Sequence, residues 1–242
     1  MVRFLGNIIF ISGAQTEQFL LQGNNTIISR LTAEGLGTRN IIYVAIDSPG
    51  SSSGVMLNLV RDRQNMLARG SRFLYPNDSD LMMRYTNELG SGAVVYVDDF
   101  SGSGDQFMKN RNRMAQFITG NFVEFFLIAC ICEEGKERLE SQGLVPIAGL
   151  THFKRDRPLH PDSTFFSTAI KQKLIDLADS MYAPSGLGHL DMAVMVILER
   201  NSPDNVPMFL RGSPSQTPFR GIFPRWGDLP VPHDGDSENA RR

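Results

Sequence analysis

Cysteine is nearly absent from this sequence of 242 residues, and its two cysteines are poorly placed to pair with each other. Cys130 and Cys132 are separated by one residue inside the apolar run Phe125–Cys132. An intramolecular disulfide between them is not expected. Two small buried apolar residues in a reducing compartment are the simpler interpretation. None of the four histidines stands at a metal-ligand spacing from these cysteines, which removes the usual sign of a zinc site.

The sequence also lacks a long apolar run and an excess of positive charge. No stretch of about 18 apolar residues is present, so a membrane span is not expected. The short apolar stretch in Met1–Ser12 is not followed by a convincing small-residue cleavage site, so we do not interpret it as a signal peptide. The formal net charge is −2, which gives no global signature of nucleic-acid binding. A cytoplasmic protein is the resulting expectation.

What is present is ordinary for a globular protein. Hydrophobic residues make up 41% of the chain and charged residues 21%, enough to form a proper core. The basic charge is mostly arginine, whose planar guanidinium suits phosphate and carboxylate groups, although a solvated surface explains these arginines equally well. The length favours one large α/β domain.

Apolar and amphipathic segments alternate along the chain. Short β-rich runs predict strands near residues 7–11, 40–45, 72–74, 93–97, 122–132, 144–150 and 192–199. Amphipathic stretches predict helices at 55–68, 78–89, 105–118, 133–141 and 165–182, and a pair of short helices at 16–34 broken at Gly23-Asn24-Asn25. This alternation indicates an α/β fold with a mainly parallel central sheet flanked by helices.

The segment with the clearest chemistry is Val94–Gln106. An apolar strand delivers Asp98 and Asp99 at its carboxyl end, and the turn Ser101-Gly102-Ser103-Gly104 then opens a helix. Ligands of open α/β sheets bind at that edge, and the amides of a glycine-rich turn can face a bound anion there. Two adjacent carboxylates at such a point suit sugar hydroxyls or a Mg²⁺ ion. The alternative is a plain strand–turn–helix connection with capping residues, and the complete constellation is more specific than that.

This segment resembles the phosphoribosyl-pyrophosphate motif of type I phosphoribosyltransferases, in which apolar residues precede two acids and a Thr/Ser-Gly loop. The resemblance implies that Asp98 and Asp99 hold the ribose hydroxyls, with Mg²⁺ as the suspected cofactor. It also implies that the 5′-phosphate is bound by Ser101, Gly102, Ser103, Gly104, Asp105 and Gln106. Asp105 departs from the pattern, since that position usually holds glycine, and Gln106 replaces a small hydroxyl residue. A carboxylate beside a phosphate is unfavourable unless it points away or is offset by a cation.

A second loop follows the first core strand. The stretch Ser48–Gly54 stands where the family places a pyrophosphate-binding loop, with Ser51, Ser52, Ser53 and Gly54 as its candidate residues. Backbone amides in such a loop can bind pyrophosphate, although this loop has no lysine and a flexible turn is an equal alternative. Arg61 and Arg63 follow on the next helix, where two residues that are two apart cannot share a face.

The last part of the chain carries a narrower resemblance. The segments Gly188–Asp191, Asn201–Phe209 and Ile222–Arg225 are similar to the end of a phosphoribosyltransferase-like family of bacterial conflict systems, including antiphage cassettes and retrons. Asn201 and Asn205 are more simply explained as residues that hold a turn. The basic run Lys154–Arg157 is interpreted as a solvated loop, with a mobile lid or a nucleic-acid contact as alternatives.

These observations together give the predicted organisation and function. Residues 1–38 form an N-terminal helical or hood segment, 39–226 a phosphoribosyltransferase-like core, and 227–242 a disordered polar tail. The resemblance implies a protein that binds a phosphoribosyl donor or nucleotide and acts as an effector of an antiviral or toxin system, with glycosyl transfer or hydrolysis as its chemistry. No catalytic base is identified. The implied partners are phosphoribosyl pyrophosphate or a nucleotide, other proteins of a defence cassette, indirectly held nucleic acid, and a second copy of the chain.

Two other kinds of function stay open at this point. The same pocket could serve a non-catalytic nucleotide sensor or a scaffold subunit, which Asp105 and the lysine-free Ser48–Gly54 loop favour. The arginine content also permits a nucleic-acid-associated retron accessory subunit, although the net charge of −2 argues against a broad nucleic-acid surface.

Overall fold

A computed structural model describes residues 2–48, 50–181, 186–212 and 221–224. The chain forms two compact units, one made of Ser12–Phe153 and the other of Met1–Ile11 together with Lys154–Arg242. These boundaries differ from the three segments expected from the sequence, and the tail at 227–242 lies outside the described residues. Within the described part of the chain, no helix has the length and apolar character that crossing a membrane requires.

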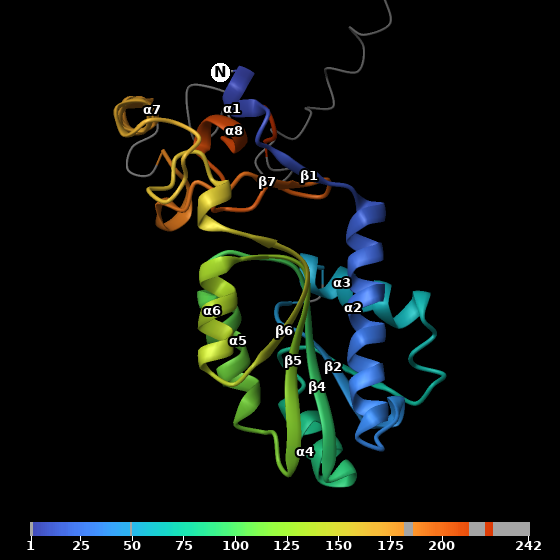
Figure 1. Ribbon diagram of the computed structural model, residues 1–242. Coiled ribbons are helices and arrows are strands. Elements are labelled where there is room, and N and C mark those ends of the chain that lie inside the picture. Colours follow the sequence, from blue (N-terminus) through green and yellow to red (C-terminus); the bar gives the residue numbers. More distant parts are fainter. Residues whose placement is uncertain (1, 49, 182–185, 213–220, 225–242) are drawn as a thin grey trace, which may run out of the picture. The chain divides into compact units, whose positions relative to one another are not determined.

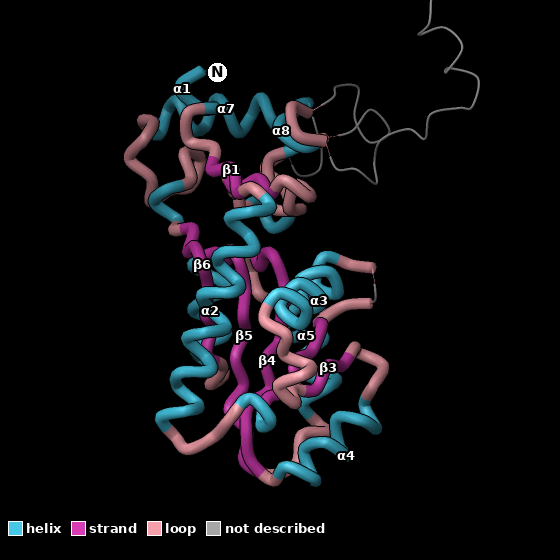
Figure 2. The backbone as a smooth tube through the Cα atoms, turned by 90° about the vertical axis from the view of Figure 1, so that its right-hand side faces the viewer, coloured by secondary structure: helices cyan, strands magenta, loops and turns pink. Residues whose placement is uncertain are grey.

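The larger unit is built on one parallel sheet. Its strands are β2 (Ile41–Ala45), β3 (Arg72–Leu74), β4 (Ser91–Ser101), β5 (Asn121–Cys132) and β6 (Val145–His152), in the order β3-β2-β4-β5-β6. Every neighbouring pair is parallel, and Figure 2 shows the strands running side by side. The α/β class and the parallel sheet predicted from the sequence are therefore confirmed. Cys130 and Cys132 are buried thiols within β5 and form no disulfide.

Helices cover both faces of this sheet, as Figure 1 shows. On one face lie α2 (Gly13–Ala33) and α3 (Ser52–Arg63), whose apolar residues meet Tyr43, Val95 and Leu127. On the other lie α4 (Ser79–Leu89), α5 (Asp105–Ala115) and α6 (Glu133–Ser141), which pack on the intervening strand residues. The near-continuous burial of the central strands follows, since parallel sheets covered on both sides have no solvated face.

The predicted break in the first long helix is wrong, because α2 is one uninterrupted helix. Ser12 caps it with a capping box that includes Gln15, and Leu20, Ile27 and Leu31 line its buried face. Gly23 lies in the middle because the helix touches the sheet there: a Cβ on it would come within 2.6 Å of Leu127 Cδ1. Tertiary packing thus overrides the low helix propensity of glycine.

The strand order creates a topological switch point between β2 and β4. The chain leaves β2 toward β3 on one side, and after β4 it continues toward β5 and β6 on the other. Ligands of open parallel sheets bind outside the carboxyl ends of the strands at such a point. The two segments that meet there are the one after Ala45 and the one after Ser101.

The smaller unit contains α1 (Val2–Leu5), β1 (Ile9–Ile11), α7 (Thr168–Met181), β7 (Val196–Leu198) and α8 (Met208–Arg211). Strands β1 and β7 pair in parallel as a separate two-stranded sheet. The strand predicted at 192–199 is shorter than expected, because β1 offers only three partner residues and Ala193 has a positive φ of 46°. Short one-turn 3-10 helices occur at Thr38–Asn40, Lys154–Asp156 and His189–Asp191.

Candidate functional site

The paired acids lie within the last residues of β4 and are buried. Asp98 is 7% exposed and Asp99 6%. The predicted strand ended before them, but β4 runs on to Ser101 because β5 continues to pair with it as far as Ile131. One carboxyl oxygen of Asp98 accepts hydrogen bonds from Ser52 Oγ at 2.9 Å and from the Asp99 backbone N–H at 2.9 Å.

Burial changes the acidity of both groups. Desolvation raises the pKa of Asp98 well above its usual range, and the neighbouring charge of Asp99 adds to this effect. Desolvation also raises the pKa of Asp99, although hydrogen bonds from the surroundings oppose that change. Among the described residues no lysine, arginine or histidine forms an ion pair with either carboxylate. The pair therefore has an electrostatic need for a cation or for hydrogen-bond donors from a ligand.

The predicted pyrophosphate loop is largely the beginning of α3. Ser51 is the N-cap residue and its Oγ accepts a hydrogen bond from the Gly54 N–H, so the helix starts at Ser52 instead of the expected Val55. Ser52 is the member that faces the acids, through its bond to Asp98. The amides of a helix N-terminus suit an anion, which keeps this segment compatible with pyrophosphate.

Ser53 has a different position from its neighbours. Its side chain is fully buried, and its hydroxyl accepts from the Ile46 N–H at 2.7 Å and donates to the Val97 carbonyl at 2.6 Å. These two bonds link Ile46, directly after β2, to Val97 within β4. Its hydroxyl is committed to the protein, so any ligand contact by Ser53 would come from its backbone.

The predicted phosphate-binding loop is a tight turn between β4 and α5. Gly104 is the N-cap of α5 with φ of 79°, a left-handed conformation that favours glycine, and it provides no side-chain cap to the first amides of the helix. Helix α6 packs against this turn through Gly135, where a Cβ would stand 2.4 Å from the Gly102 carbonyl oxygen. The loop is therefore shaped by two glycines on different elements.

The departure at Asp105 is compensated by a cation. The Asp105 carboxylate accepts a hydrogen bond from Ser103 Oγ at 2.7 Å and forms an ion pair with Arg138 of α6. Asp105 and Arg138 are both about half exposed, so a ligand anion can replace Asp105 as the partner of Arg138. A cation of the protein thus stands beside the loop where the sequence alone showed only an unfavourable negative charge.

A second hydrogen bond joins the segment after β2 to the start of α5. Gln106 Nε2 donates to Asp47 Oδ2 at 3.0 Å, across a separation of 59 residues. Together with the Ser52–Asp98 bond it brings the segment after β2 and the segment after β4 to one place. Asp47 was not a predicted site residue, although its place two residues after a buried strand could have indicated it. Arg138 and Gly135, in the helix after β5, had no signal in the sequence.

The residues present fit a Mg²⁺ ion bound together with a ligand. Among the residues that the structure describes, no group of three or more His, Cys, Asp or Glu side chains forms a metal-binding cluster. Mg²⁺ is commonly held by one or two carboxylates while phosphates and water complete its shell. Two buried carboxylates without a basic partner match that requirement, and Asp98 and Asp99 are the residues that would hold the ion.

The motifs near the end of the chain meet each other in the smaller unit. Asn205 Nδ2 donates to the His189 carbonyl at 3.1 Å, and the Val194 N–H donates to the Asn205 carbonyl at 2.9 Å. Ser202 Oγ donates to the Phe223 carbonyl at 2.7 Å. The structural role expected for Asn205 is thus confirmed, and Arg225 lies outside the described residues.

Arginines of the two basic segments considered from the sequence bind residues of their own units. Arg63 pairs with Glu17 of α2, while Arg61 pairs with the adjacent Asp62. Arg157 is fully buried, with Nη1 donating to the Met192 carbonyl at 3.4 Å. The interpretation of Lys154–Arg157 as a solvated loop is therefore wrong at Arg157, because the chain folds over that guanidinium.

Known proteins that are similar to this chain include one family and a solved structure. The model of the PRTase-CE family, in which PRTase abbreviates phosphoribosyltransferase, matches residues 1–225. An orotate phosphoribosyltransferase from Aeropyrum pernix is a structural neighbour with 15% sequence identity and a TM-score of 0.37; the match covers 56% of this chain and 68% of that chain. No curated protein matches the sequence.

Proposed function

The chain belongs to the PRTase-CE family, and on that premise we propose that it binds a phosphoribosyl donor or a nucleotide at the carboxyl edge of its sheet. The observation that carries the proposal is the convergence of two loops on the buried acid pair through the Ser52–Asp98 and Gln106–Asp47 hydrogen bonds. A ribose with phosphates at both ends needs hydroxyl acceptors between two anion-binding segments. The sequence from α3 through the end of β4 to α5 offers these three parts in that order.

Each part has a defined task in this proposal. Asp98 and Asp99 accept hydrogen bonds from the ribose hydroxyls, which relieves their desolvation. The turn Ser101–Gln106 binds the 5′-phosphate through backbone amides at the start of α5, with Arg138 as the countercharge. The first turn of α3, from Ser51 to Gly54, binds the pyrophosphate. A Mg²⁺ ion held by the two acids would supply positive charge beside the departing pyrophosphate.

Glycosyl transfer or hydrolysis is the chemistry that such a site supports. The bond from C1 of the ribose to pyrophosphate breaks, and a base or a water molecule takes its place. The contribution of the protein is then positioning and electrostatic stabilisation of a positively charged sugar and a leaving anion. No general base is assigned to the site.

Calorimetric titration of phosphoribosyl pyrophosphate with Mg²⁺ tests the binding step. We expect micromolar binding by the wild type and at least tenfold weaker binding by an Asp98→Asn/Asp99→Asn variant, a loss of about 1.4 kcal/mol or more. Asp80→Asn, an exposed carboxylate in the first turn of α4, is the matched control and should bind as the wild type does. A folded wild type that binds neither this donor nor a nucleoside monophosphate would refute the proposal.

A non-catalytic sensor is the second candidate, and one observation favours it. The Asp105 carboxylate occupies the phosphate loop and already uses Ser103 Oγ and Arg138, which a catalytic loop would offer to its substrate. Measuring release of inorganic pyrophosphate from the bound donor separates the two candidates. Release by the wild type and not by the double variant supports an enzyme, whereas tight binding without release supports a sensor.

At the level of the cell, we propose an effector role in an antiviral or toxin system, together with other proteins of a defence cassette. The support is the resemblance of Gly188–Asp191, Asn201–Phe209 and Ile222–Arg225 to a family of bacterial conflict systems. Phage challenge of cells that carry the complete cassette, with the wild type or the Asp98→Asn/Asp99→Asn variant, tests this role. Protection that survives in the variant would leave the pocket without a part in defence.

A further inference from the structure

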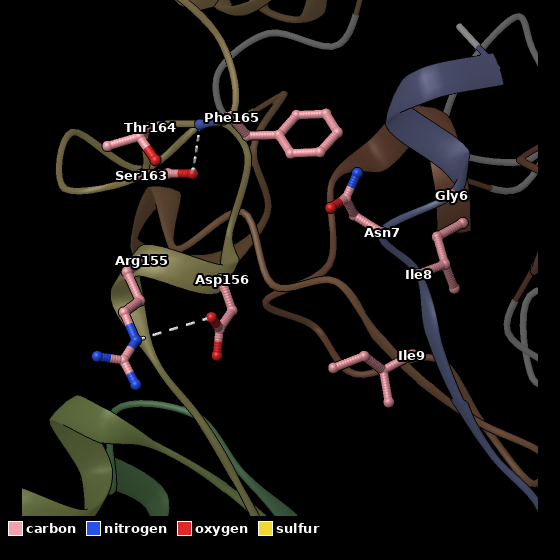
Figure 3. A pocket seen from close by; sticks show the side chains of 9 residues that line it. All are labelled: Gly6, Asn7, Ile8, Ile9, Arg155, Asp156, Ser163, Thr164 and Phe165. Atoms are coloured by element: carbon pink, nitrogen blue, oxygen red, sulfur yellow. Dashed lines mark hydrogen bonds and ion pairs between the residues drawn. The ribbon is translucent and has the colours of Figure 1, made fainter.

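The smaller unit contains a cavity that the proposed function does not use. Its volume is about 390 Å³, and residues 6–9, 155–156 and 163–165 line it (Figure 3). Small-molecule sites usually measure roughly 300–1,000 Å³, so this cavity suits a ligand at the lower end of that range. All of its walls come from one compact unit.

One wall of the cavity presents the ring of Phe165, which packs against other aromatic rings. Phe165 is 37% exposed, and its ring makes an edge contact with Phe166 at 4.8 Å between centroids. Phe166 in turn stacks on the buried Phe4 at 6.4 Å, and Phe4 meets Phe209 at 5.3 Å. This aromatic chain fixes the ring of Phe165, and Figure 3 shows it extending toward Asn7. A large exposed aromatic ring at a cavity is suited to stacking with a planar ligand.

The segment that carries Phe165 is anchored by a buried lysine. Lys171 of α7 is 7% exposed, and its Nζ donates to the carbonyls of His160, Pro161 and Ser163. Ser163 Oγ in turn accepts from the Phe165 N–H at 3.4 Å. These bonds order the wall before any ligand arrives, which lowers the entropic cost of binding.

The opposite wall and the end of the cavity are polar. The side-chain amide of Asn7 carries both donors and an acceptor, and it lies across the cavity from the Phe165 ring (Figure 3). Arg155 Nε and Asp156 Oδ1 stand 3.9 Å apart, with side chains 74% and 47% exposed. Such a loose ion pair can turn to donate to and accept from the hydroxyls of a neutral ligand.

We propose that this cavity is a nucleoside-binding site. The base stacks on Phe165, the amide of Asn7 reads an edge of the base that has both donors and acceptors, and Arg155 and Asp156 bind the sugar hydroxyls. A purely apolar ligand would not complement the amide and the ion pair, and an inorganic anion would not complement the ring. The paired charges at the end of the cavity favour a neutral sugar over a phosphate. The inference is carried by this cavity alone and does not depend on the proposed donor site.

The test uses adenosine, guanosine, cytidine and uridine without phosphate or Mg²⁺, which removes the phosphate and metal contacts of the donor site from the measurement. Saturation-transfer NMR and calorimetry on the full chain should detect binding of at least one of them to the wild type. Phe165→Ala and Asn7→Ala should each weaken that binding at least tenfold. Phe165→Trp should retain it, because it preserves a stacking ring, and its fluorescence should change on binding.

Two controls keep a negative result interpretable. Leu190→Ala removes a side chain of the same unit that is 59% exposed, and it should bind nucleoside as the wild type does. Thermal unfolding of each variant identifies any that has lost its fold. Failure of all four nucleosides to bind the wild type, or binding unchanged in Phe165→Ala, would overturn the proposal. Binding that is lost in Asp98→Asn/Asp99→Asn and kept in Phe165→Ala would assign the nucleoside to the acid pair instead, and would also overturn it.

Discussion

Asp98 and Asp99 are buried in the folded chain although burial disfavours their charged form. Both are more than nine-tenths buried, and desolvation is the first cause of the raised pKa of each group. Residues that a fold retains at such a cost are common at ligand sites, since function commonly needs groups that are unfavourable in the empty protein. The cost itself can be measured.

The first prediction concerns the pH dependence of that cost at Asp98. Because the pKa of Asp98 is higher in the folded than in the unfolded state, the folded chain binds the proton more tightly. The free energy of unfolding of the wild type therefore falls as the pH rises above the ordinary carboxyl pKa. Asparagine can still accept the bonds from Ser52 and from the Asp99 N–H. Without Mg²⁺ or ligand at pH 7, we expect Asp98→Asn to be more stable than the wild type by roughly 1–3 kcal/mol.

Thermal or urea unfolding of both proteins between pH 7 and pH 4 checks this. The advantage of the variant should shrink steadily as the pH falls, because the buried Asp98 carboxyl of the folded wild type then takes up a proton and loses the charge that burial penalises. A variant that is less stable than the wild type at every pH would show that Asp98 stabilises the empty fold.

The second prediction concerns the countercharge at Asp105. Asp105→Asn removes the carboxylate that competes for Arg138 and Ser103, so the affinity for a phosphorylated ligand should rise about tenfold. Arg138→Ala should lower the affinity by a similar factor. Lys136→Ala is the control, because Lys136 lies on the same helix in an exposed pair with Glu140. Calorimetry with phosphoribosyl pyrophosphate measures all three, and equal affinities for Asp105→Asn and the wild type would remove Asp105 from the binding loop.

At the scale of elements, α2 shows how a sheet surface selects the residues of a helix. Gly23 and the neighbouring Asn24 look like a helix break in the sequence, yet both lie on the face that meets the rest of the unit. Asn24 is fully buried, and its Oδ1 accepts a hydrogen bond from Tyr43 OH at 2.7 Å. A small residue and a satisfied polar residue allow the helix to approach the sheet closely.

The third prediction follows from that approach. Alanine in place of glycine usually stabilises a helix by about 0.5–1 kcal/mol. At Gly23 we expect the opposite, a loss of roughly 1–3 kcal/mol, because the added Cβ meets Leu127 and Ile147. Urea unfolding measures the change, and Gln22→Ala, at an exposed position in the same turn, should stay within about 0.5 kcal/mol of the wild type. A stabilised Gly23→Ala would mean that α2 can move away from the sheet without cost.

At the scale of the whole molecule, all the residues proposed for the donor site belong to one of the two compact units. The segments 47–54 and 98–106 and Arg138 all lie within Ser12–Phe153. The cavity proposed to bind a nucleoside belongs to the other unit. Substitutions in one unit can therefore test one site without altering the residues of the other.

The fourth prediction uses ligand linkage in the complete chain. Phosphoribosyl pyrophosphate with Mg²⁺ at a hundred times its dissociation constant should stabilise the folded state by about 2.7 kcal/mol. For a chain of this size that corresponds to an increase of several degrees in Tm. Removing Mg²⁺ with a chelator should cancel most of the increase, because the acid pair then faces the ligand phosphates without a cation. Differential scanning calorimetry checks this, and an equal increase in Asp98→Asn/Asp99→Asn would locate binding elsewhere.

The sequence by itself determined the fold class and showed the acids and the glycine turn at the end of β4. Burial on both faces makes the central strands continuously apolar, and two acids followed by a glycine turn are visible because they are consecutive. The same local signals were misleading at Gly23 and at residues 192–199, where contacts with Leu127 and the short β1 decide the outcome.

Only the tertiary structure decided what surrounds the acids. Ser52 and Asp98 are 46 residues apart, Asp47 and Gln106 are 59 apart, and Asp105 and Arg138 are 33 apart. No periodicity in the sequence reveals these pairs, since each depends on the order of strands in the sheet and on which helix packs on which face. Hydrophobic pattern fixes the faces of single elements, whereas the partners of a polar side chain are fixed only when the elements are assembled.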